Sequence, residues 1–183
     1  ITFEDRTELH TYQQNLEYLA VHDTLTGLPN RRALGDMLNR AIAKAKRGTM
    51  SSLLYMDLDN FKDINDTVGH SAGDEVLITL TGILRNAFRT EDVLFRLGGD
   101  EFAALLEGIG TGDALSAAER LRSIVAAYDF EVSGQSFRLS LSIGLIAIDG
   151  HLESKELLSK ADAAMYRAKD QGKNRIVGAE AAE

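Results

Sequence analysis

The segment Arg96–Phe102 constrains the fold most, because it places two adjacent glycines directly before two carboxylates and an apolar run. A Gly-Gly pair between two short apolar stretches, Val93–Leu97 and Glu101–Leu106, is typical of a tight β-hairpin turn. Glycine also lets a ligand approach the backbone closely. Adjacent carboxylates suit a hard divalent cation such as Mg²⁺. The segment therefore predicts a hairpin whose turn holds a metal–phosphate site.

Composition limits the classes of protein to which the chain can belong. The 183 residues include no cysteine, which excludes a disulfide framework and a thiolate zinc site. The net charge of −8 argues against binding of a nucleic-acid polymer, whose phosphates attract basic surfaces. No apolar run reaches the length of a membrane span, and no signal peptide is visible. We expect one domain with a short appendage.

Hydrophobic periodicity after residue 30 indicates a mixture of helices and strands. Helices are predicted over 31–46, 72–88, 113–127 and 154–169. Strands are predicted over 52–56, 93–97, 101–106, 130–132, 137–148 and 174–177. Ser71 is the expected N-cap of the second helix. The mixed order of hairpins and helical crossovers predicts an α+β fold, a mostly antiparallel central sheet flanked by helices.

Residues 1–21 carry a short apolar seam ahead of this domain. Its members are spaced three and four apart, at Leu9, Tyr12, Leu16 and Leu19. The pattern fits either a coiled-coil stalk or an amphipathic helix packed on its own domain, and two heptads do not decide between them. Residues 5–8 resemble the end of a PAS sensor domain, and the chain opens at Ile1 rather than Met. We therefore expect a piece of a longer protein with an upstream sensor domain.

A second acidic segment, Asp57-Leu58-Asp59, follows the strand predicted over 52–56. Functional groups commonly lie on loops at the ends of strands. Because Asp57 and Asp100 come from neighbouring predicted strands, both are expected to reach one Mg²⁺, whose shell substrate phosphates and water complete. Solvated turn carboxylates are the alternative. The joint presence of Asp57, Asp100 and Glu101 beside two glycines favours the metal site.

The ordered set of motifs resembles the GGDEF family of diguanylate cyclases. The segments that carry the resemblance are 23–32, 57–66, 69–74, 96–102, 142–144 and 161–169. They extend over nearly everything after residue 20, and an ordered set of this kind does not arise by chance. The resemblance implies a domain over 22–178 with a tail at 179–183. It also implies a fold like the palm of adenylyl cyclases and polymerases.

The family's reaction joins two GTP molecules into cyclic di-GMP and releases two pyrophosphates. The resemblance implies that Asp57 and Asp100 hold Mg²⁺ or Mn²⁺, two ions per active site, with the Leu58 carbonyl as a further ligand. Glu101 is implied to bind the second ion or to help deprotonate the ribose 3′-hydroxyl. Each domain holds one GTP, so the resemblance implies a homodimer. Two ions can activate the attacking oxygen and stabilise the leaving pyrophosphate.

Further residues are implied to contact the nucleotide. They are Gly98, Gly99, Phe61, Lys62, Lys169 and Lys173. The family often has Arg at the position of Lys173, so a bidentate phosphate contact becomes a point charge. A lysine near a helix end also stabilises the helix dipole, and this explains Lys173 equally well.

Asn65 and Asp74 are implied to select guanine. A carboxylate can accept from the N1–H and N2–H donors of guanine, a donor pair that adenine lacks. The alternative for Asp74 is a capping-box-like contact with Ser71, and the two roles are compatible.

The stretch Arg89–Asp92 resembles the family's inhibitory site, where product dimers bind, and Arg120 is implied as a further contact. Taken alone, this stretch would be a turn with a local ion pair of little energetic weight. The alternative to an active cyclase is a catalytically silent receptor or scaffold that binds nucleotide or cyclic di-GMP. A transferase acting on another base is a third possibility, against which Asn65 and Asp74 argue. We expect a cytoplasmic domain, with any membrane anchor of a longer protein lying upstream.

Overall fold

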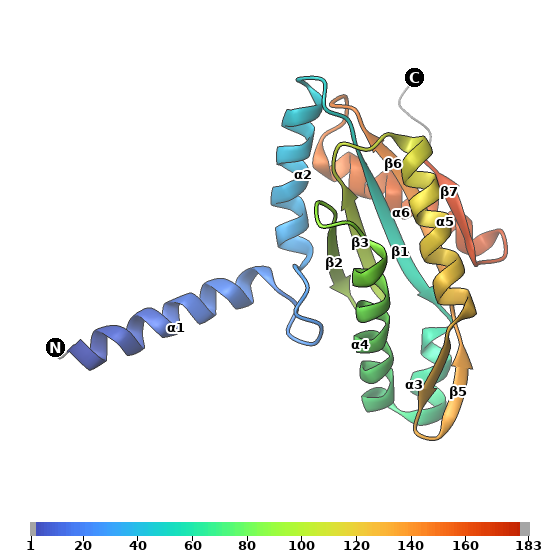
Figure 1. The fold of residues 1–183 in the computed structure, drawn as a ribbon, viewed down its shortest axis with the longest axis horizontal. Coiled ribbons are helices and arrows are strands. Elements are labelled where there is room, and N and C mark those ends of the chain that lie inside the picture. The colour runs from blue at the N-terminus through green and yellow to red at the C-terminus, as the bar shows by residue number, and fades with distance from the viewer. Residues whose placement is uncertain (1–2, 180–183) are drawn as a thin grey trace.

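The computed structural model describes residues 3–179, and it shows a five-stranded sheet with helices on both faces (Figure 1). The strand order is β2-β3-β1-β6-β7. The strands are β1 (Ser51–Asp59), β2 (Val93–Gly98), β3 (Glu101–Leu106), β6 (Ser140–Ile148) and β7 (Arg175–Gly178). Neighbouring strands are antiparallel, except that β7 runs parallel to β6. The predicted α+β fold with a mostly antiparallel sheet is confirmed.

Two helical layers cover the sheet. The helices are α2 (Arg31–Ala45), α4 (His70–Ala87), α5 (Thr111–Ala127) and α6 (Ser154–Asp170). α4 and α5 pack on one face, and α2 and α6 pack on the other (Figure 1). Side chains of β1 alternate between the two cores, with Met56 on the α4 side and Leu53 on the α2 side. The central strand β1 is therefore buried along its whole length.

The prediction of one strand over 137–148 is wrong. The structure divides this stretch into β5 (Gln135–Arg138) and β6, with Leu139 between them. The division arises because the two halves have different partners. β5 pairs with β4 (Asp129–Val132) in a separate hairpin, whereas β6 pairs with β1.

The sequence interpretation also missed a short helix, α3 (Phe61–Val68). Its apolar residues Phe61, Ile64 and Val68 have helical spacing, a signal that the sequence contained. The expected N-cap at Ser71 is wrong, because α4 begins at His70 and Gly69 occupies the N-cap position with φ 92° and without a side-chain cap. The alternative role of Asp74, a capping-box-like contact with Ser71, is wrong for the same reason. A positive φ at Gly69 lets the chain turn directly from α3 into α4.

The N-terminal helix α1 (Phe3–Val21) projects from the body as a rod (Figure 1). Its seam residues are largely exposed, from 51% at Leu16 and Leu19 to 67% at Leu9. The alternative in which this seam packs on its own domain is therefore wrong. Over residues 3–179, no helix combines the length and apolarity needed to cross a bilayer. The predicted tail 179–183 lies outside the described residues, apart from Ala179.

Candidate active site

The sheet brings Asp57 beside the turn that joins β2 and β3. The register places Asp57 opposite Glu101, and the Leu58 backbone N–H donates to the Asp100 carbonyl at 3.2 Å. β1 continues to Asp59, so Asp57 lies within the strand and not after its end. The antiparallel pairing of β1 with β3 thus brings together two acidic segments that are far apart in the sequence, as predicted from their neighbouring strands.

Asp57 is a buried carboxylate whose partner comes from α6. Lys169 Nζ donates to Asp57 Oδ1 at 2.7 Å, and the Asp57 side chain is 10% exposed. Burial raises the pKa of Asp57 to about 7 against the effect of the Lys169 hydrogen bond, and the charges of Asp100 and Glu101 contribute to the rise. Because burial and neighbouring negative charges disfavour the ionised form of Asp57, a cation beside this carboxylate would stabilise it.

Glu101 points to a different set of groups. Its Oε2 accepts from the Tyr55 hydroxyl at 3.3 Å and from Arg31 Nη2 at 3.4 Å. Within residues 3–179, no three His, Cys, Asp or Glu side chains form a ready-made cation site. Mg²⁺ usually takes one or two protein carboxylates and completes its shell with phosphates and water. The carboxylates of Asp57 and Asp100 fit a site of that kind.

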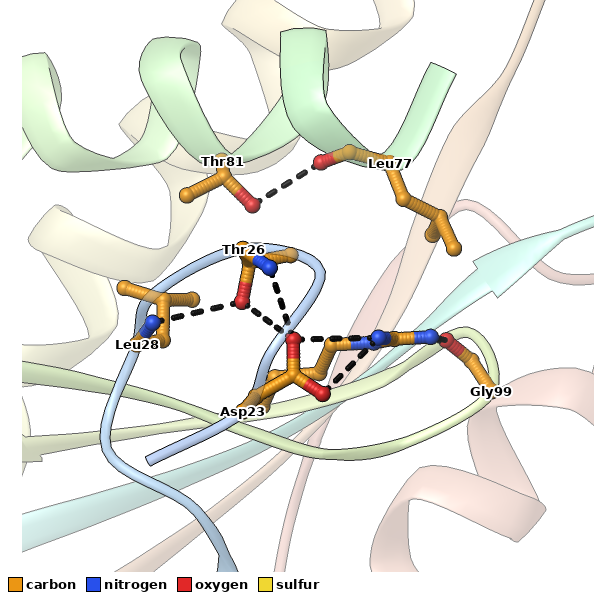
Figure 2. A network of polar contacts seen from close by, with 7 residues as sticks. Asp23, Thr26, Leu28, Leu77, Thr81 and Gly99 are labelled. Atoms are coloured by element: carbon orange, nitrogen blue, oxygen red, sulfur yellow. Dashed lines mark hydrogen bonds and ion pairs between the residues drawn. The ribbon is translucent and has the colours of Figure 1, made fainter. Parts of the chain in front are cut away.

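An ion pair that the sequence interpretation did not single out holds the Gly98-Gly99 turn. Arg96 donates to both oxygens of Asp23 at 3.0 and 3.1 Å, and to the Gly99 carbonyl at 3.1 and 2.8 Å (Figure 2). Asp23 also accepts from the Thr26 backbone N–H and hydroxyl. Residues 23–26 follow the end of α1. The ion pair therefore joins the start of the domain to the turn that precedes the two carboxylates.

The turn requires glycine for conformational reasons. Gly98 has φ 136° and Gly99 has φ 49°, a region that side chains disfavour. A Cβ built at either position would meet no atom of the described chain within 4 Å. The backbone of the turn is therefore not covered by other residues of the described chain.

Replacing Asp23 by asparagine should lower the free energy of unfolding by about 2 kcal/mol at pH 7, because Arg96 loses a largely buried charged partner. Burial acts to raise the pKa of Asp23, but hydrogen bonds from Thr26 and Arg96 outweigh it and hold the pKa below its usual 3.8. The ionised carboxylate therefore stabilises the fold above this usual value. That contribution disappears as the pH falls through the folded-state pKa.

Urea unfolding of the wild type and Asp23→Asn between pH 3 and pH 7 measures this effect. The gap between the two proteins should narrow below about pH 4. Asp36→Asn, an exposed change on α2, should leave stability unchanged. A gap that stays constant across the pH series would contradict the role of the ionised carboxylate.

The three lysines predicted to contact phosphate differ in their surroundings. Lys169 reaches Asp57, but Lys173 Nζ donates to Asn60 Oδ1 at 2.7 Å, just ahead of α3. Lys62 is exposed on α3. Asp59 accepts from the hydroxyls of Ser140 and Ser142 and from the Asn174 backbone N–H, and so joins β1 to β6 and to the residue before β7.

The predicted base contacts lie on the adjoining helices α3 and α4. Asp74 is exposed near the start of α4. Asn65 Oδ1 is buried, and no hydrogen-bond partner for it exists among the described residues. Phe61 is 8% exposed and belongs to the core on the α4 side, so its ring is a packing group in this structure.

The stretch from Arg89 to Asp92 forms a compact turn at the start of β2. Asp92 Oδ2 accepts from the Arg89 backbone N–H at 3.1 Å and lies 3.6 Å from Arg89 Nε. The Asp92 side chain is 4% exposed, and its Oδ1 has no partner within residues 3–179. Both residues line a cavity of about 220 Å³, beside Phe88. Arg120 Nη2 donates to the Ala87 carbonyl at 3.2 Å, which brings this arginine close to the turn.

Comparison with known proteins identifies the family. The family described as "Diguanylate cyclase, GGDEF domain" matches residues 20–175. The chain is 43% identical over 170 residues to the bifunctional diguanylate cyclase/cyclic di-GMP phosphodiesterase MucR of Pseudomonas aeruginosa, and this match covers 92% of this chain and 25% of MucR. It is 42% identical over 181 residues to diguanylate cyclase DgcM of Escherichia coli, and that match covers 96% of this chain and 42% of DgcM. The chain thus spans less than half the length of these relatives.

Solved structures agree with the sequence relatives. The coiled coil and GGDEF domain of DgcB from Caulobacter crescentus, in complex with c-di-GMP, superposes with a TM-score of 0.87 at 28% identity. That match covers 96% of this chain and 94% of the DgcB chain. The resemblance inferred from the motifs is confirmed, and the chain belongs to the GGDEF diguanylate cyclase domain family.

Proposed function

We propose that this domain is a metal-dependent diguanylate cyclase that condenses two GTP molecules into cyclic di-GMP and releases two pyrophosphates. The observation that carries the proposal is the pairing of buried Asp57 with the β2–β3 turn that bears Asp100 and Glu101. An open glycine turn and the amine of Lys169 adjoin these carboxylates. Together these groups supply ligands for a metal ion, a cation for the phosphates and an exposed backbone for the nucleotide, all of which nucleotidyl transfer requires.

The residues of this site would take distinct roles. Asp57, Asp100 and the Leu58 carbonyl would hold Mg²⁺ or Mn²⁺, and the bound ions would polarise the phosphate and stabilise the leaving pyrophosphate. Lys169 can transfer its hydrogen bond from Asp57 to a phosphate oxygen. Glu101 is oriented by Tyr55 and Arg31, and it can bind the second ion or accept a proton from the ribose 3′-hydroxyl.

Lys62 and Lys173 would add charge for the triphosphate. They come from α3 and from the loop after α6, where Lys173 bonds Asn60. Gly98 and Gly99 would accommodate the nucleotide without a side-chain clash. GTP as the substrate implies a cytoplasmic domain.

The reaction needs two copies of the domain, since each copy supplies one GTP. We propose a homodimer with the two active sites facing each other. The exposed apolar seam of α1 supports this arrangement, because burial of Leu9, Tyr12, Leu16 and Leu19 against a second copy would stabilise a coiled coil. The stalk over 1–21 would then connect an upstream sensor to the cyclase domain at 22–178.

Incubation with Mg²⁺ and either GTP or ATP, followed by identification of the products, tests this function. Cyclic di-GMP formed at a rate per molecule that rises with protein concentration is the expected result. Nucleotide binding without product would instead indicate a silent receptor, and an adenine-containing product would indicate a transferase of other specificity. A chelator should abolish turnover, and added Mg²⁺ should restore it.

Asp74→Ala should reduce the preference for GTP over ATP by about 10²-fold, because the exposed carboxylate is proposed to accept two hydrogen bonds from guanine. The measurement is the ratio of kcat/KM for the two nucleotides. Glu75→Ala, the neighbouring exposed acid on α4, is the matched control and should keep the preference. Full retention of GTP selectivity in Asp74→Ala would rule out this role.

We also propose that cyclic di-GMP inhibits the enzyme at the Arg89–Asp92 turn. Asp92 lines the adjoining cavity, its Oδ1 has no partner among residues 3–179, and a small movement of the turn would let it accept from a guanine edge. Arg89 is 56% exposed and can exchange its contact with Asp92 for a phosphate or a stacked base. The adjoining cavity and the approach of Arg120 support a ligand site.

Arg89→Ala should raise the cyclic di-GMP concentration for half-inhibition by about tenfold or more, because a charged phosphate contact is lost. Initial rates across a series of added product measure the change. Arg40→Ala removes an exposed arginine from α2 and should leave inhibition unchanged. Identical inhibition curves for Arg89→Ala and the wild type would exclude this turn as the inhibitory site.

A further inference from the structure

Gly73 lies in α4 at a close contact with α3. A Cβ built on Gly73 would lie 2.0 Å from Asn65 Oδ1 and 3.1 Å from Phe61 Cζ. Real Cβ atoms do not approach an oxygen that closely, so the Asn65 side chain occupies the space that an alanine at 73 would fill. We propose that Gly73 is a positioning residue for guanine recognition: the missing side chain leaves room for Asn65 between the two helices and so holds the Asn65 amide in place for the base. This inference rests on the proposed function.

The backbone at Gly73 does not itself require glycine. Gly73 lies within α4, and its φ is not in the left-handed region. Glycine in a helix interior is less stable than alanine, because it adds conformational entropy to the unfolded chain. Gly82 in the same helix is exposed, and a Cβ there would meet no atom of the described chain within 4 Å. The contact with Asn65 therefore distinguishes Gly73 from Gly82.

The state of Asn65 supports a functional reason for this contact. Its Oδ1 is buried and has no hydrogen-bond partner among the described residues. A buried acceptor without a partner is unfavourable, so a side chain with this arrangement calls for an explanation. Packing against Gly73 restricts the rotamers of Asn65. Such restriction lowers the entropy lost when a ligand binds.

The position of Gly73 also relates Asn65 to the second base contact. Asp74 follows Gly73 directly and is exposed at the start of α4. The close approach at Gly73 thus sets the distance between the α3 residue and the α4 residue that are proposed to bind guanine. A methyl group at 73 would displace Asn65 and leave Asp74 in place. We therefore expect base recognition to be weakened in part.

The experiment compares Gly73→Ala with Gly82→Ala in the full chain. Binding of a GTP analogue with a non-cleavable bridge between the α- and β-phosphates is measured by calorimetry, and turnover is measured with GTP and ATP. Gly73→Ala should weaken binding of the analogue and raise the half-saturating GTP concentration by about tenfold, with kcat changed much less. Gly82→Ala should bind as the wild type does. Wild-type affinity in Gly73→Ala would overturn the inference.

A double-mutant cycle with Asn65→Ala shows whether Gly73 acts through Asn65. In the Asn65→Ala background, Gly73→Ala should cause no further loss of affinity and should raise the unfolding midpoint, as we also expect for Gly82→Ala. An equal loss of affinity in both backgrounds would overturn the inference. If Gly73→Ala alone fails to fold, recovery of folding in the double variant supports the contact, and failure of the double variant refutes it.

Different outcomes would refute the proposed function and the role of Gly73. A wild type that forms no cyclic di-GMP would refute the cyclase, whatever the variants do. Loss of GTP affinity in Gly73→Ala but not in Gly82→Ala would then still support the positioning role in a nucleotide receptor. A wild type that binds no GTP analogue would refute both.

Discussion

Replacing Asp57 by asparagine should lower the rate of cyclic di-GMP formation by about 10³-fold or more, because a metal ligand at the reacting phosphate is lost. The carboxylate lies in β1 beside the acidic turn, 2.7 Å from Lys169 Nζ. Asparagine keeps the shape of the side chain and removes its charge. Initial rates at saturating GTP and Mg²⁺ measure the loss.

The fold should survive this substitution. Burial disfavours the ionised form of Asp57, so a neutral amide is tolerated there, and the Lys169 side chain is 27% exposed and can turn to water. Asp63→Asn removes an exposed acid from the nearby α3 and serves as the charge-matched control. A folded Asp57→Asn protein that keeps a tenth of the wild-type rate would contradict the proposed metal site.

Gly144→Ala should lower the free energy of unfolding by about 3 kcal/mol, at the upper end of overpacking effects. A Cβ on Gly144 in β6 would lie 2.1 Å from the Ala161 carbonyl oxygen and 2.6 Å from the Met165 backbone nitrogen. Both atoms belong to the backbone of α6, so a side-chain rotation cannot relieve the clash. The helix as a whole must move away from the sheet. Chemical denaturation of the variant and the wild type measures the loss.

Gly35→Ala provides the control for this change. Gly35 lies in α2, and a Cβ there would meet no atom of the described chain within 4 Å. The substitution should stabilise the protein by roughly 0.5–1 kcal/mol through helix propensity. Since α6 also carries Lys169, Gly144→Ala should weaken GTP binding in whatever fraction remains folded. Wild-type stability in Gly144→Ala would show that α6 does not pack as closely as the structure indicates.

Sequence reasoning works best in this protein where a pattern is local. Helices α2, α5 and α6 repeat apolar residues with helical spacing, and the glycine turn between β2 and β3 has a local chemical requirement. The division at Leu139 between β5 and β6 was not predictable in this way. Both halves of 137–148 are extended, and only their different partners separate them. The start of α4 was also not predicted correctly, because the turn at Gly69 sets this boundary in place of a cap at Ser71.

The family, the α+β class and the acidic turn can be inferred from the sequence, because they follow from ordered motifs and from local periodicity. Which distant groups meet depends instead on how the chain folds. β-Sheet pairing places Asp57 opposite Glu101, packing of α6 on β6 brings Lys169 to Asp57, and the turn after α1 supplies Asp23 to Arg96. These contacts join residues far apart in the chain. Their formation depends on sheet register and helix packing, which no local pattern specifies.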